Sequence, residues 1–364
     1  MTSTSIYIHI PFCHTICSYC DFCKINYRQE YVDAYLDSLS KEIKSRYQNE
    51  PVKTIYIGGG TPSCLSPKEL TKLLELITIF NLDKEYEYTI ECNIEDITLD
   101  KIKLFKKYGI NRLSIGVQSF NKDIIKKLNR HHDKDLVFKN INLLKEYFDN
   151  INIDLIYGVT NDIDIVKEDI TNFLKLDISH ISCYSLIIEK NTKLYLDNQE
   201  YIDEDIDKSM FDYINDTLTK NGYIHYEISN YAKPGYESIH NKTYWQNLEY
   251  YGFGLSAVSY LNNHRISNTK NMTKYLNGNY IDNDNYEDIS IQKENDLILG
   301  LRLIKGISID TFNNKYHDDL LSKEIIKKLL QDKYLEVSNN YLHCNYQYIY
   351  LLNYILSQIL GSDL

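Results

Sequence analysis

From residue 6 to about residue 190, short strand-like apolar runs alternate with longer segments in which apolar side chains recur at helical spacing. The strand-like runs are Ile6–Ile10, Thr54–Ile57, Tyr86–Cys92, Arg112–Val117, Asn152–Tyr157 and His180–Leu186. The helical segments are Tyr31–Ile43, Lys68–Ile79, Asp100–Tyr108, Leu136–Phe148 and Asp164–Leu176. Six strand–helix units in series predict an α/β fold with a parallel sheet and right-handed crossovers. Six units are short of a closed eight-stranded barrel but enough for a partial one.

Beyond residue 200 the pattern is less regular, and we expect one helix there, Asp203–Lys220. In the last part of the chain, three helical segments flank a short hairpin. The helices are expected near Glu287–Leu303, Leu320–Leu330 and Tyr346–Leu360, and the hairpin at Leu335–Val337 and Tyr341–Cys344. This order predicts a C-terminal α+β domain of winged-helix-like type. We therefore divide the chain into residues 1–200, 201–285 and 286–364.

Unusual polar residues follow the predicted strands. A cysteine motif follows the first strand and Gly58-Gly59-Gly60-Thr61-Pro62 the second, while Glu91, Gln118 and Asp154 lie at or near the ends of the next three. In parallel barrels, chemistry takes place at the C-terminal ends of the strands. These side chains could therefore lie close together at one open end, or mouth, of the partial barrel.

The chain has 364 residues, of which 43% are hydrophobic and 25% charged, as is usual for a globular protein. Its net charge of −11 argues against nucleic acid as a partner, because phosphate binding favours clustered Lys and Arg. No signal peptide precedes Ile6 and no stretch is apolar for long enough to span a bilayer, so we expect a cytoplasmic protein. In such a compartment the eight cysteines are not expected to form a disulfide framework.

Cys13, Cys17 and Cys20 form a Cys-x3-Cys-x2-Cys motif, which is the sharpest chemical signal in the chain. Thiolates bind iron in Fe–S clusters, and a 4Fe–4S cluster normally takes four protein ligands. Three cysteines leave one iron open, and S-adenosylmethionine (SAM) can bind there through its amino and carboxylate groups. Reduction of the cluster then releases a 5′-deoxyadenosyl radical. The alternative is a zinc site with Cys23 or His14 as the fourth ligand.

The other candidate residues give weaker evidence for a functional site when each is considered alone. The glycines permit close backbone approach to a ligand, or simply form a tight turn. Arg130 offers the planar fork that binds a carboxylate, but each of Glu91, Gln118, Arg130 and Asp154 also fits a structural hydrogen bond or ion pair. His240 lies near the only tryptophan, Trp245, and could be an axial ligand of haem iron. A hydrogen-bonded histidine in a packed turn is the simpler interpretation.

Five segments together resemble the oxygen-independent coproporphyrinogen III oxidase (HemN-like) branch of the radical SAM superfamily. They are Tyr7–Cys13 with the cysteine motif, Gly58–Pro62, Arg112–Phe120, Asn129-Arg130 and Asp154–Gly158. Within this branch the chain is most similar to the HemW haem chaperones. It begins almost at the first strand, Asp21-Phe22 follows Cys20, and residues 226–254 resemble the haem-associated region of that family. The likeness spans nearly the whole chain.

The resemblance implies a radical SAM partial (β/α)6 barrel in residues 1–200, a HemW-type linking and haem-associated region in residues 201–285, and the C-terminal domain after them. It makes His240 the best candidate for a haem contact and places Glu91 and the glycines at the methionine and ribose end of SAM. Arg130 suits the SAM carboxylate. The implied SAM site consists of Tyr7, Tyr19, Gly59, Gly60, Thr61, Glu91, Gln118, Arg130 and Asp154.

The function implied by the resemblance is a haem chaperone. It would bind haem as cargo, keep a SAM-ligated 4Fe–4S cluster and deliver haem to respiratory or other haem proteins. Any association with a membrane would be peripheral and would run through those partners. The alternative is an enzyme that oxidatively decarboxylates coproporphyrinogen III to protoporphyrinogen IX, and a third is a radical SAM enzyme with an unrelated substrate. No catalytic residue is assigned.

Three departures from the family pattern affect details. Cys23 lies three residues after Cys20, whereas the extra cysteine of the oxidase lies two after, so we expect Cys23 to stay outside the cluster. Thr160 replaces a usual proline. Leu255–Val258 replaces a usual Pro-Gly-Ala-His segment, so a contact by that second histidine is lost. These changes affect the geometry of the loops more than the cofactors.

Overall fold

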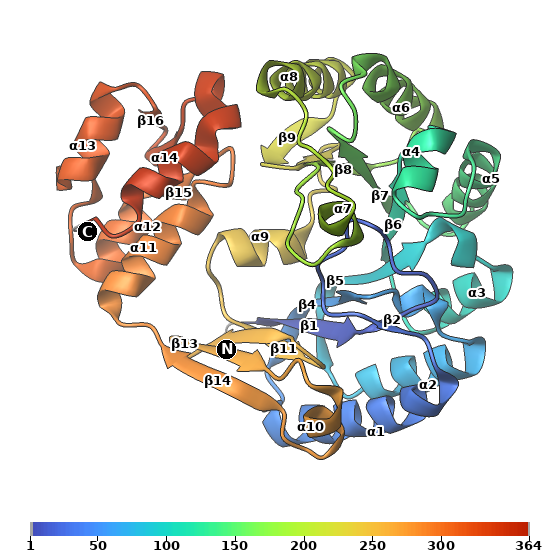
Figure 1. Ribbon diagram of the computed structural model, residues 1–364. Coiled ribbons are helices and arrows are strands. Elements are labelled where there is room, and N and C mark those ends of the chain that lie inside the picture. The colour runs from blue at the N-terminus through green and yellow to red at the C-terminus, as the bar shows by residue number, and fades with distance from the viewer. Residues whose placement is uncertain (1–2, 363–364) are drawn as a thin grey trace.

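The computed structural model describes residues 3–362 and forms a large curved sheet with helices outside it, joined to a smaller helical unit (Figure 1). The strands of the large sheet are β1 Thr4–Ile10, β4 Pro51–Gly59, β5 Asn81–Asn93, β6 Arg112–Gln118, β7 Asn150–Tyr157, β8 His180–Ser185, β9 Ile224–Glu227, β10 Asn230–Ala232, β11 Tyr250–Phe253, β12 Val258–Leu261, β13 His264–Asn268 and β14 Ile281–Tyr286. The helices that accompany them are α1 Gln29–Arg46, α2 Pro67–Ile77, α3 Leu99–Lys107, α4 Lys122–Lys127, α5 Lys134–Lys145, α6 Ile163–Leu176, α7 Lys193–Leu196, α8 Glu204–Lys220, α9 Ile239–Trp245 and α10 Met272–Leu276.

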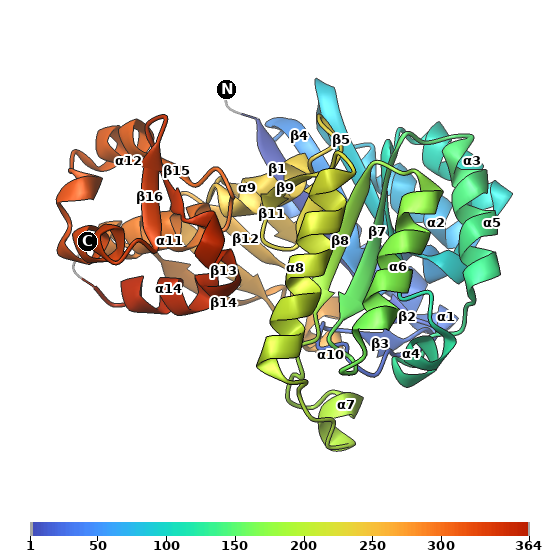
Figure 2. The ribbon, with the colours of Figure 1, turned by 90° about the horizontal axis from the view of Figure 1, so that it is seen from above.

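The six predicted strands are confirmed. They lie in the order β1-β4-β5-β6-β7-β8, and every neighbouring pair is parallel. The predicted helices are confirmed as α1, α2, α3, α5 and α6, and Figure 2 shows α6 and α8 along the outer side of the curve. The sheet does not close into a barrel, in agreement with the predicted partial barrel.

The less regular segment, residues 224–286, extends this sheet at both edges. β10 and β9 continue it antiparallel beyond β8, whereas β11 pairs parallel with β1 on the opposite side. β12, β13 and β14 follow β11 as antiparallel strands. The complete sheet has twelve strands, and β1 is an internal strand within it. The division of the chain at residues 200 and 285 stays a prediction.

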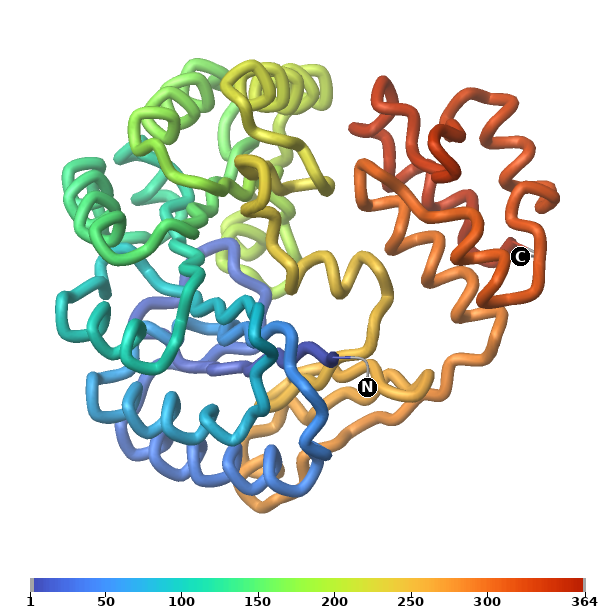
Figure 3. The backbone as a smooth tube through the Cα atoms, turned by 180° about the vertical axis from the view of Figure 1, so that it is seen from behind, coloured from blue at the N-terminus to red at the C-terminus, as the bar shows by residue number. Residues whose placement is uncertain are grey.

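The C-terminal unit has the predicted winged-helix-like architecture and lies beside the open side of the curved sheet (Figure 3). Its elements are α11 Ile289–Gly300, β15 Ile307–Ser308, α12 Ile309–Tyr316, α13 Glu324–Gln331, β16 Leu335–Ser338, β17 Tyr341–Cys344 and α14 Leu352–Ile359. A separate core holds them together, with Leu297, Phe312 and Leu342 almost completely buried. None of the helices within residues 3–362 is long and apolar enough to cross a membrane.

Side chains of the parallel strands alternate between the outer helices and the inside of the curve. In β6, Leu113, Ile115 and Val117 are fully buried in the core shared with the helices. Arg112 and Ser114 take the opposite face, where Ser114 Oγ lies 3.5 Å from Asp154 Oδ2. The concave side is therefore buried but polar. We call it the lumen.

A buried carboxylate holds α9 on the lumen side of the sheet. Glu87 of β5 accepts hydrogen bonds from Ile239 N at 2.8 Å, His240 N at 2.9 Å and Ser238 Oγ at 3.2 Å. The first N–H groups of a helix have no partner within the helix, and a negative charge there also meets the positive end of the helix dipole. Glu87 therefore positions His240 inside the lumen.

Glu42 of α1 is a fully buried carboxylate that fastens the late strands to the first helix. It pairs with Arg46 at 2.6 Å. It also accepts hydrogen bonds from Tyr275 Oη and Asn268 Nδ2, each at 2.6 Å, and from Gly254 N at 2.9 Å. A buried charge is tolerated when it is paired and its remaining lone pairs are used, and both conditions are met here.

Replacing Glu42 by Leu should lower the free energy of unfolding by about 3–5 kcal/mol, because Arg46 loses its counter-charge and three donors lose their acceptor. Urea unfolding followed by circular dichroism measures this loss. Glu30→Leu is the matched control, since the Arg28–Glu30 pair is exposed and 4.0 Å apart. We expect a change below about 0.5 kcal/mol there, and equal losses in both variants would contradict the role of Glu42.

Candidate functional site

The cysteine motif lies on a loop whose two ends are held together. β2 Phe12–Cys13 pairs with β3 Ile25–Asn26, and Tyr27 N donates to Cys13 O at 2.8 Å. The intervening residues 14–24 carry Cys17 and Cys20. All eight cysteines are free thiols. The closed loop keeps three of these thiols within one short segment at the end of β1.

A chain of polar contacts links two of the cysteines to neighbouring strands. Thr61 Oγ1 donates to Cys13 Sγ at 3.4 Å, and Asn93 Nδ2 donates to Thr61 Oγ1 at 3.4 Å. Arg130 Nη1 donates to Asn93 Oδ1 at 2.6 Å and to Cys17 Sγ at 3.8 Å. Two predicted site residues, Thr61 and Arg130, therefore contact the cysteine loop. Asn93 joins these two residues; it lies at the end of a predicted strand but was not among the predicted site residues.

Burial raises the pKa of the Cys13 thiol to about 11, against the opposing effect of the Thr61 hydroxyl, and it also raises the pKa of Cys20. Iron binds thiolates, so both thiols would release a proton on metal binding. Three free thiols on one loop, two of them beside hydrogen-bond donors, are a donor set that fits three irons of a 4Fe–4S cluster.

Cys23 and His14, the two alternative ligands, contact other groups. Cys23 packs against the main hydrophobic core, and its carbonyl oxygen lies 2.7 Å from His9 Nε2. The centre of the His14 ring lies 4.7 Å from that of Tyr27. This packing supports the expectation that Cys23 stays outside the cluster, which remains a prediction.

The glycine segment after β4 packs tightly against the residues that lead into the cysteine loop. Gly59 has a φ of +110°, and a Cβ atom there would lie 2.4 Å from the His9 ring. A Cβ atom on Gly60 would lie 2.7 Å from the carbonyl carbon of Pro11, and Gly60 N donates to Ile10 O at 2.8 Å. Only glycine fits at either position. These glycines therefore fix how closely β4 approaches the end of β1.

Four predicted site residues from separate parts of the chain line one cavity of about 210 Å³: Tyr7, Gly59, Glu91 and His240. The other lining residues were not among the predicted site residues, although all but Tyr56 lie in segments that carry the family resemblance; they are Phe22, Tyr56, Asn241 and Tyr244. Tyr56 could have been found from the alternation of β4, because it shares a face with Thr54 and Gly58. The volume lies below the roughly 300–1,000 Å³ of most small-molecule pockets, so a large ligand requires side chains to move.

Glu91 forms the polar centre of this cavity. Tyr56 Oη donates to Glu91 Oε1 at 2.7 Å, and Gly59 N donates to Oε2 at 3.0 Å. Burial raises the pKa of Glu91 to about 7, aided by the charge of Asp154 and opposed by these two hydrogen bonds. The carboxyl group therefore changes its protonation near neutral pH.

His240 is 1% exposed, and both of its ring nitrogens are engaged. Nδ1 lies 2.7 Å from Thr54 Oγ1 and Nε2 lies 2.8 Å from Tyr244 Oη, while the ring stacks on Tyr56 at 5.1 Å between centres. Burial, and then the charge of Arg112, lower the pKa of His240 to about 3. The neutral ring could ligate iron, but one of its two hydrogen bonds has to break first.

The side chains of Gln118 and Arg130 both lie close to Gly116 of β6. A Cβ atom on Gly116 would lie 3.1 Å from Gln118 Nε2 and 3.6 Å from Arg130 Nη2. Arg130 Nη2 also donates to Gly116 O at 2.9 Å and pairs with Glu95 at 3.2 Å. Within residues 3–362 its Nε is a buried donor without an acceptor. One position of this guanidinium is therefore open to a ligand.

The remaining predicted residues, Tyr19 and Asp154, do not line the cavity. The pKa of Tyr19 is raised mainly by burial and then by the charge of Cys17, while Arg130 acts in the opposite direction. Asp154 accepts a hydrogen bond from Asn152 Nδ2 at 2.8 Å, and burial raises its pKa. Four of the predicted residues therefore share one cavity, and that all of them form a single site stays a prediction.

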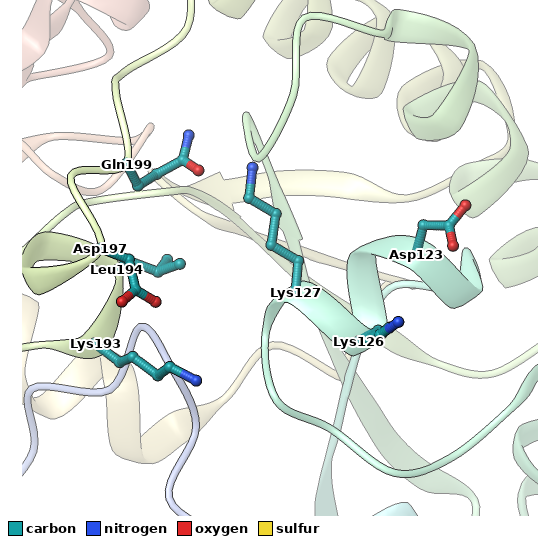
Figure 4. A pocket seen from close by; sticks show the side chains of 7 residues that line it. All are labelled: Asp123, Lys126, Lys127, Lys193, Leu194, Asp197 and Gln199. Carbon is teal, nitrogen blue, oxygen red and sulfur yellow. The ribbon is translucent and has the colours of Figure 1, made fainter.

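A second cavity, of about 440 Å³, lies between α4 and α7 (Figure 4). Ser18 of the cysteine loop joins the two helices, since its N donates to Leu128 O at 3.1 Å and its O accepts from Leu194 N at 2.9 Å. The cavity therefore backs onto the cysteine loop, but none of the predicted site residues lines it. Its lining consists of Asp123, Lys126, Lys127, Lys193, Leu194, Asp197 and Gln199.

Comparisons with known proteins agree with this geometry. The model of the radical SAM superfamily matches residues 7–170, which include the cysteine motif. The heme chaperone HemW of Lactococcus lactis subsp. lactis (strain IL1403) is 38% identical over 99% of this chain and 98% of its own length. HemW of Bacillus subtilis (strain 168) is 34% identical over 98% and 99%, and HemW of Escherichia coli (strain K12) is 33% identical over 76% and 77%.

Among solved structures, the coproporphyrinogen III oxidase HemN of Escherichia coli, described as a radical SAM enzyme, matches with a TM-score of 0.87 over 99% of this chain and 90% of its own. At 23% identity this likeness shows the fold alone. A radical SAM domain implies a 4Fe–4S cluster and SAM rather than a zinc ion. Because the sequence relationship extends over almost the entire chain, the chain belongs to the HemW family of haem chaperones within the radical SAM superfamily.

Proposed function

We propose that this chain binds haem, carries a SAM-ligated 4Fe–4S cluster and delivers the haem to other proteins. The observation that carries the proposal is the cavity shared by Glu91 and His240. The cavity is lined by Gly59 and Glu91 of the candidate SAM site and by His240 of the candidate haem motif. The likeness to proteins named heme chaperones over nearly all of the chain supports the same function.

Cys13, Cys17 and Cys20 would hold the cluster, which when bound can pass an electron to SAM at its open iron. The residues beside the thiols would tune it, because hydrogen bonds to cluster sulfurs affect the reduction potential. Thr61 Oγ1 and Arg130 Nη1 are the donors beside Cys13 and Cys17.

Nine residues around the mouth would bind SAM, with Arg130 on its carboxylate and Glu91 at the methionine and ribose end. The free Nε of Arg130 supports this assignment, because a buried donor without a partner favours an acceptor such as a carboxylate. The nine residues are Tyr7, Tyr19, Gly59, Gly60, Thr61, Glu91, Gln118, Arg130 and Asp154.

His240 would contact the haem iron after either Thr54 or Tyr244 releases its ring nitrogen. The aromatic rings of Tyr56 and Tyr244 then flank the same cavity and suit a planar macrocycle. We further propose a cytoplasmic location, transfer of haem to respiratory or other haem proteins, and contact with membranes only through those partners. The net charge of −11 argues against nucleic acid as a binding partner, so we propose none.

Cys17→Ser should lose the cluster, because it removes one of three protein ligands, whereas Cys23→Ser should keep it. Iron and sulfide content of protein reconstituted without oxygen measures both. The two cysteines lie on the same loop, so the pair controls for effects on loop folding. Equal loss in Cys23→Ser would make that thiol a ligand and contradict the assignment.

Wild-type protein with an intact cluster should give a haem Soret band, and His240→Ala should weaken haem binding about tenfold or more. Anaerobic titration with haem measures this. His180→Ala is the matched control, because His180 is also buried in the lumen, with Asn152 Oδ1 and Tyr226 Oη at 2.7 and 2.8 Å from its two nitrogens. Equal losses in both variants would trace the effect to folding.

The same preparation should be offered coproporphyrinogen III in parallel, with SAM and a reductant. We expect no protoporphyrinogen. Formation of that product, or the absence of any Soret band with haem, would overturn the chaperone proposal in favour of an enzyme.

SAM affinity should rise as the pH increases through about 7, because Glu91 has to lose its proton before both oxygens can accept hydrogen bonds. Below that pH the affinity should fall by up to about tenfold per pH unit. Glu91→Gln should remove this dependence, while Glu69→Gln, in the capping box of α2, should retain it. Calorimetric titration measures the affinities, and a pH-independent wild type would contradict the role of Glu91.

A further inference from the structure

Arg112 is a buried cation without a hydrogen-bonded partner. It begins β6 and is 2% exposed. Within residues 3–362 its guanidinium makes no hydrogen bond or close ion pair and its Nε is a buried donor without an acceptor, while Glu91 and Asp154 interact with it through charge alone. Arg130, which is also buried, differs because it binds Asn93 and Glu95, and the partly buried Arg46 binds Glu42. An unpaired buried charge is costly, so its presence needs an explanation.

Two further unpartnered polar atoms lie beside Arg112. Thr89, Arg112 and Asn150 are direct neighbours in the pairing of β5, β6 and β7. Paired residues point to the same face of a sheet, so the three side chains form one row in the lumen. Thr89 Oγ1 and Asn150 Oδ1 are both buried without a hydrogen-bond partner. Because buried polar atoms nearly always have partners, this row marks a place for a polar ligand.

The row adjoins one lining residue of the 210 Å³ cavity, although none of its three members lines the cavity itself. Tyr56, which lines that cavity, pairs directly with Thr89, so a single small side chain separates Tyr56 from Arg112 across the strands. The charge of Arg112 also lowers the pKa values of Glu91 and His240, two further lining residues. The cavity is too small for a macrocycle, but a flexible arm of a larger ligand could enter it.

The free Nε of Arg112 indicates which chemical group such a flexible arm would carry. Carboxylates bind arginine side-on through Nε and one Nη, which gives two parallel hydrogen bonds. Two carboxylates of the lumen, Glu91 and Asp154, interact with Arg112 through charge, but their hydrogen bonds are made with other groups, such as Tyr56 and Asn152. A carboxylate of the ligand would supply the hydrogen-bonded partner that Arg112 lacks.

We propose that Arg112 binds a propionate carboxylate of the haem, with Thr89 Oγ1 as a second donor. A half-turn of the Asn150 amide would present its NH₂ group to the same carboxylate. This inference rests on the proposed haem binding and adds to it the residue that recognises the acidic side of the macrocycle.

Haem and haem dimethyl ester differ only in whether these carboxylates are free, so they test the proposal directly. Wild-type protein should bind haem about tenfold or more tightly than the ester. Arg112→Met should bind both with the affinity of the ester. Arg112→Lys keeps the charge but loses the fork, and should recover only part of the preference. Anaerobic titration of the Soret band measures all six affinities.

Thermal unfolding of the ligand-free variants separates binding from structure. Arg112→Met should unfold at the same or a higher temperature than wild type, because it removes a buried charge that no hydrogen bond or close ion pair compensates. Arg46→Met is the matched control and should unfold at a lower temperature, because Arg46 donates to Glu42 at 2.6 Å and to Ser259 at 2.9 Å.

Each contrary result has a distinct meaning. If Arg112→Met melts as low as Arg46→Met, Arg112 is a structural residue and the inference is wrong. Equal binding of haem and ester by wild type would overturn carboxylate recognition while the haem proposal stands. No haem binding by wild type would overturn both.

Discussion

The pairing of β1 on both sides is the constraint on which the rest of the site depends. β1 lies between β4 and β11, and both pairings are parallel. A strand held by two ladders cannot change register without moving every side chain to the wrong face. The inward side chains Tyr7 and His9 are thereby fixed next to Tyr56 and Gly58. The cysteine loop that follows therefore starts from a rigid element, as a site with demanding geometry requires.

Around this strand the buried polar groups largely satisfy one another, which makes the exceptions informative. Thr61, Asn93 and Arg130 form a continuous chain of hydrogen bonds between two cysteines, and Glu87 satisfies the start of α9. Such networks are stable only when nearly every member has its partners. The two arginine Nε atoms left over, in Arg112 and Arg130, both belong to the lumen and its mouth. Donors without acceptors at these places are expected of a site that binds carboxylates.

The parallel strands were predictable because the alternation of their side chains between two faces is set within each strand. Leu113, Ile115 and Val117 share one face of β6 and pack in the core with the helices. β11 was not predictable, because four residues that include a glycine carry no periodic signal. The reason for that glycine is a tertiary contact, since a Cβ atom on Gly252 would overlap Val258 O. In the same way the motif singled out His240, but its place in the lumen comes from Glu87, a residue of a distant strand.

The burial of His240 would limit the affinity with which a chaperone of this structure binds haem. Iron can reach the ring only if the contact with Thr54 or Tyr244 is broken, and the net loss of one such hydrogen bond is about 1 kcal/mol. The small cavity adds the cost of moving side chains aside. A ligand that binds a minor conformation has its affinity reduced by the population of that conformation. If the proposed function holds, release of haem to a recipient would benefit from this reduction, because the closed lumen would regain its own hydrogen bonds when the haem leaves.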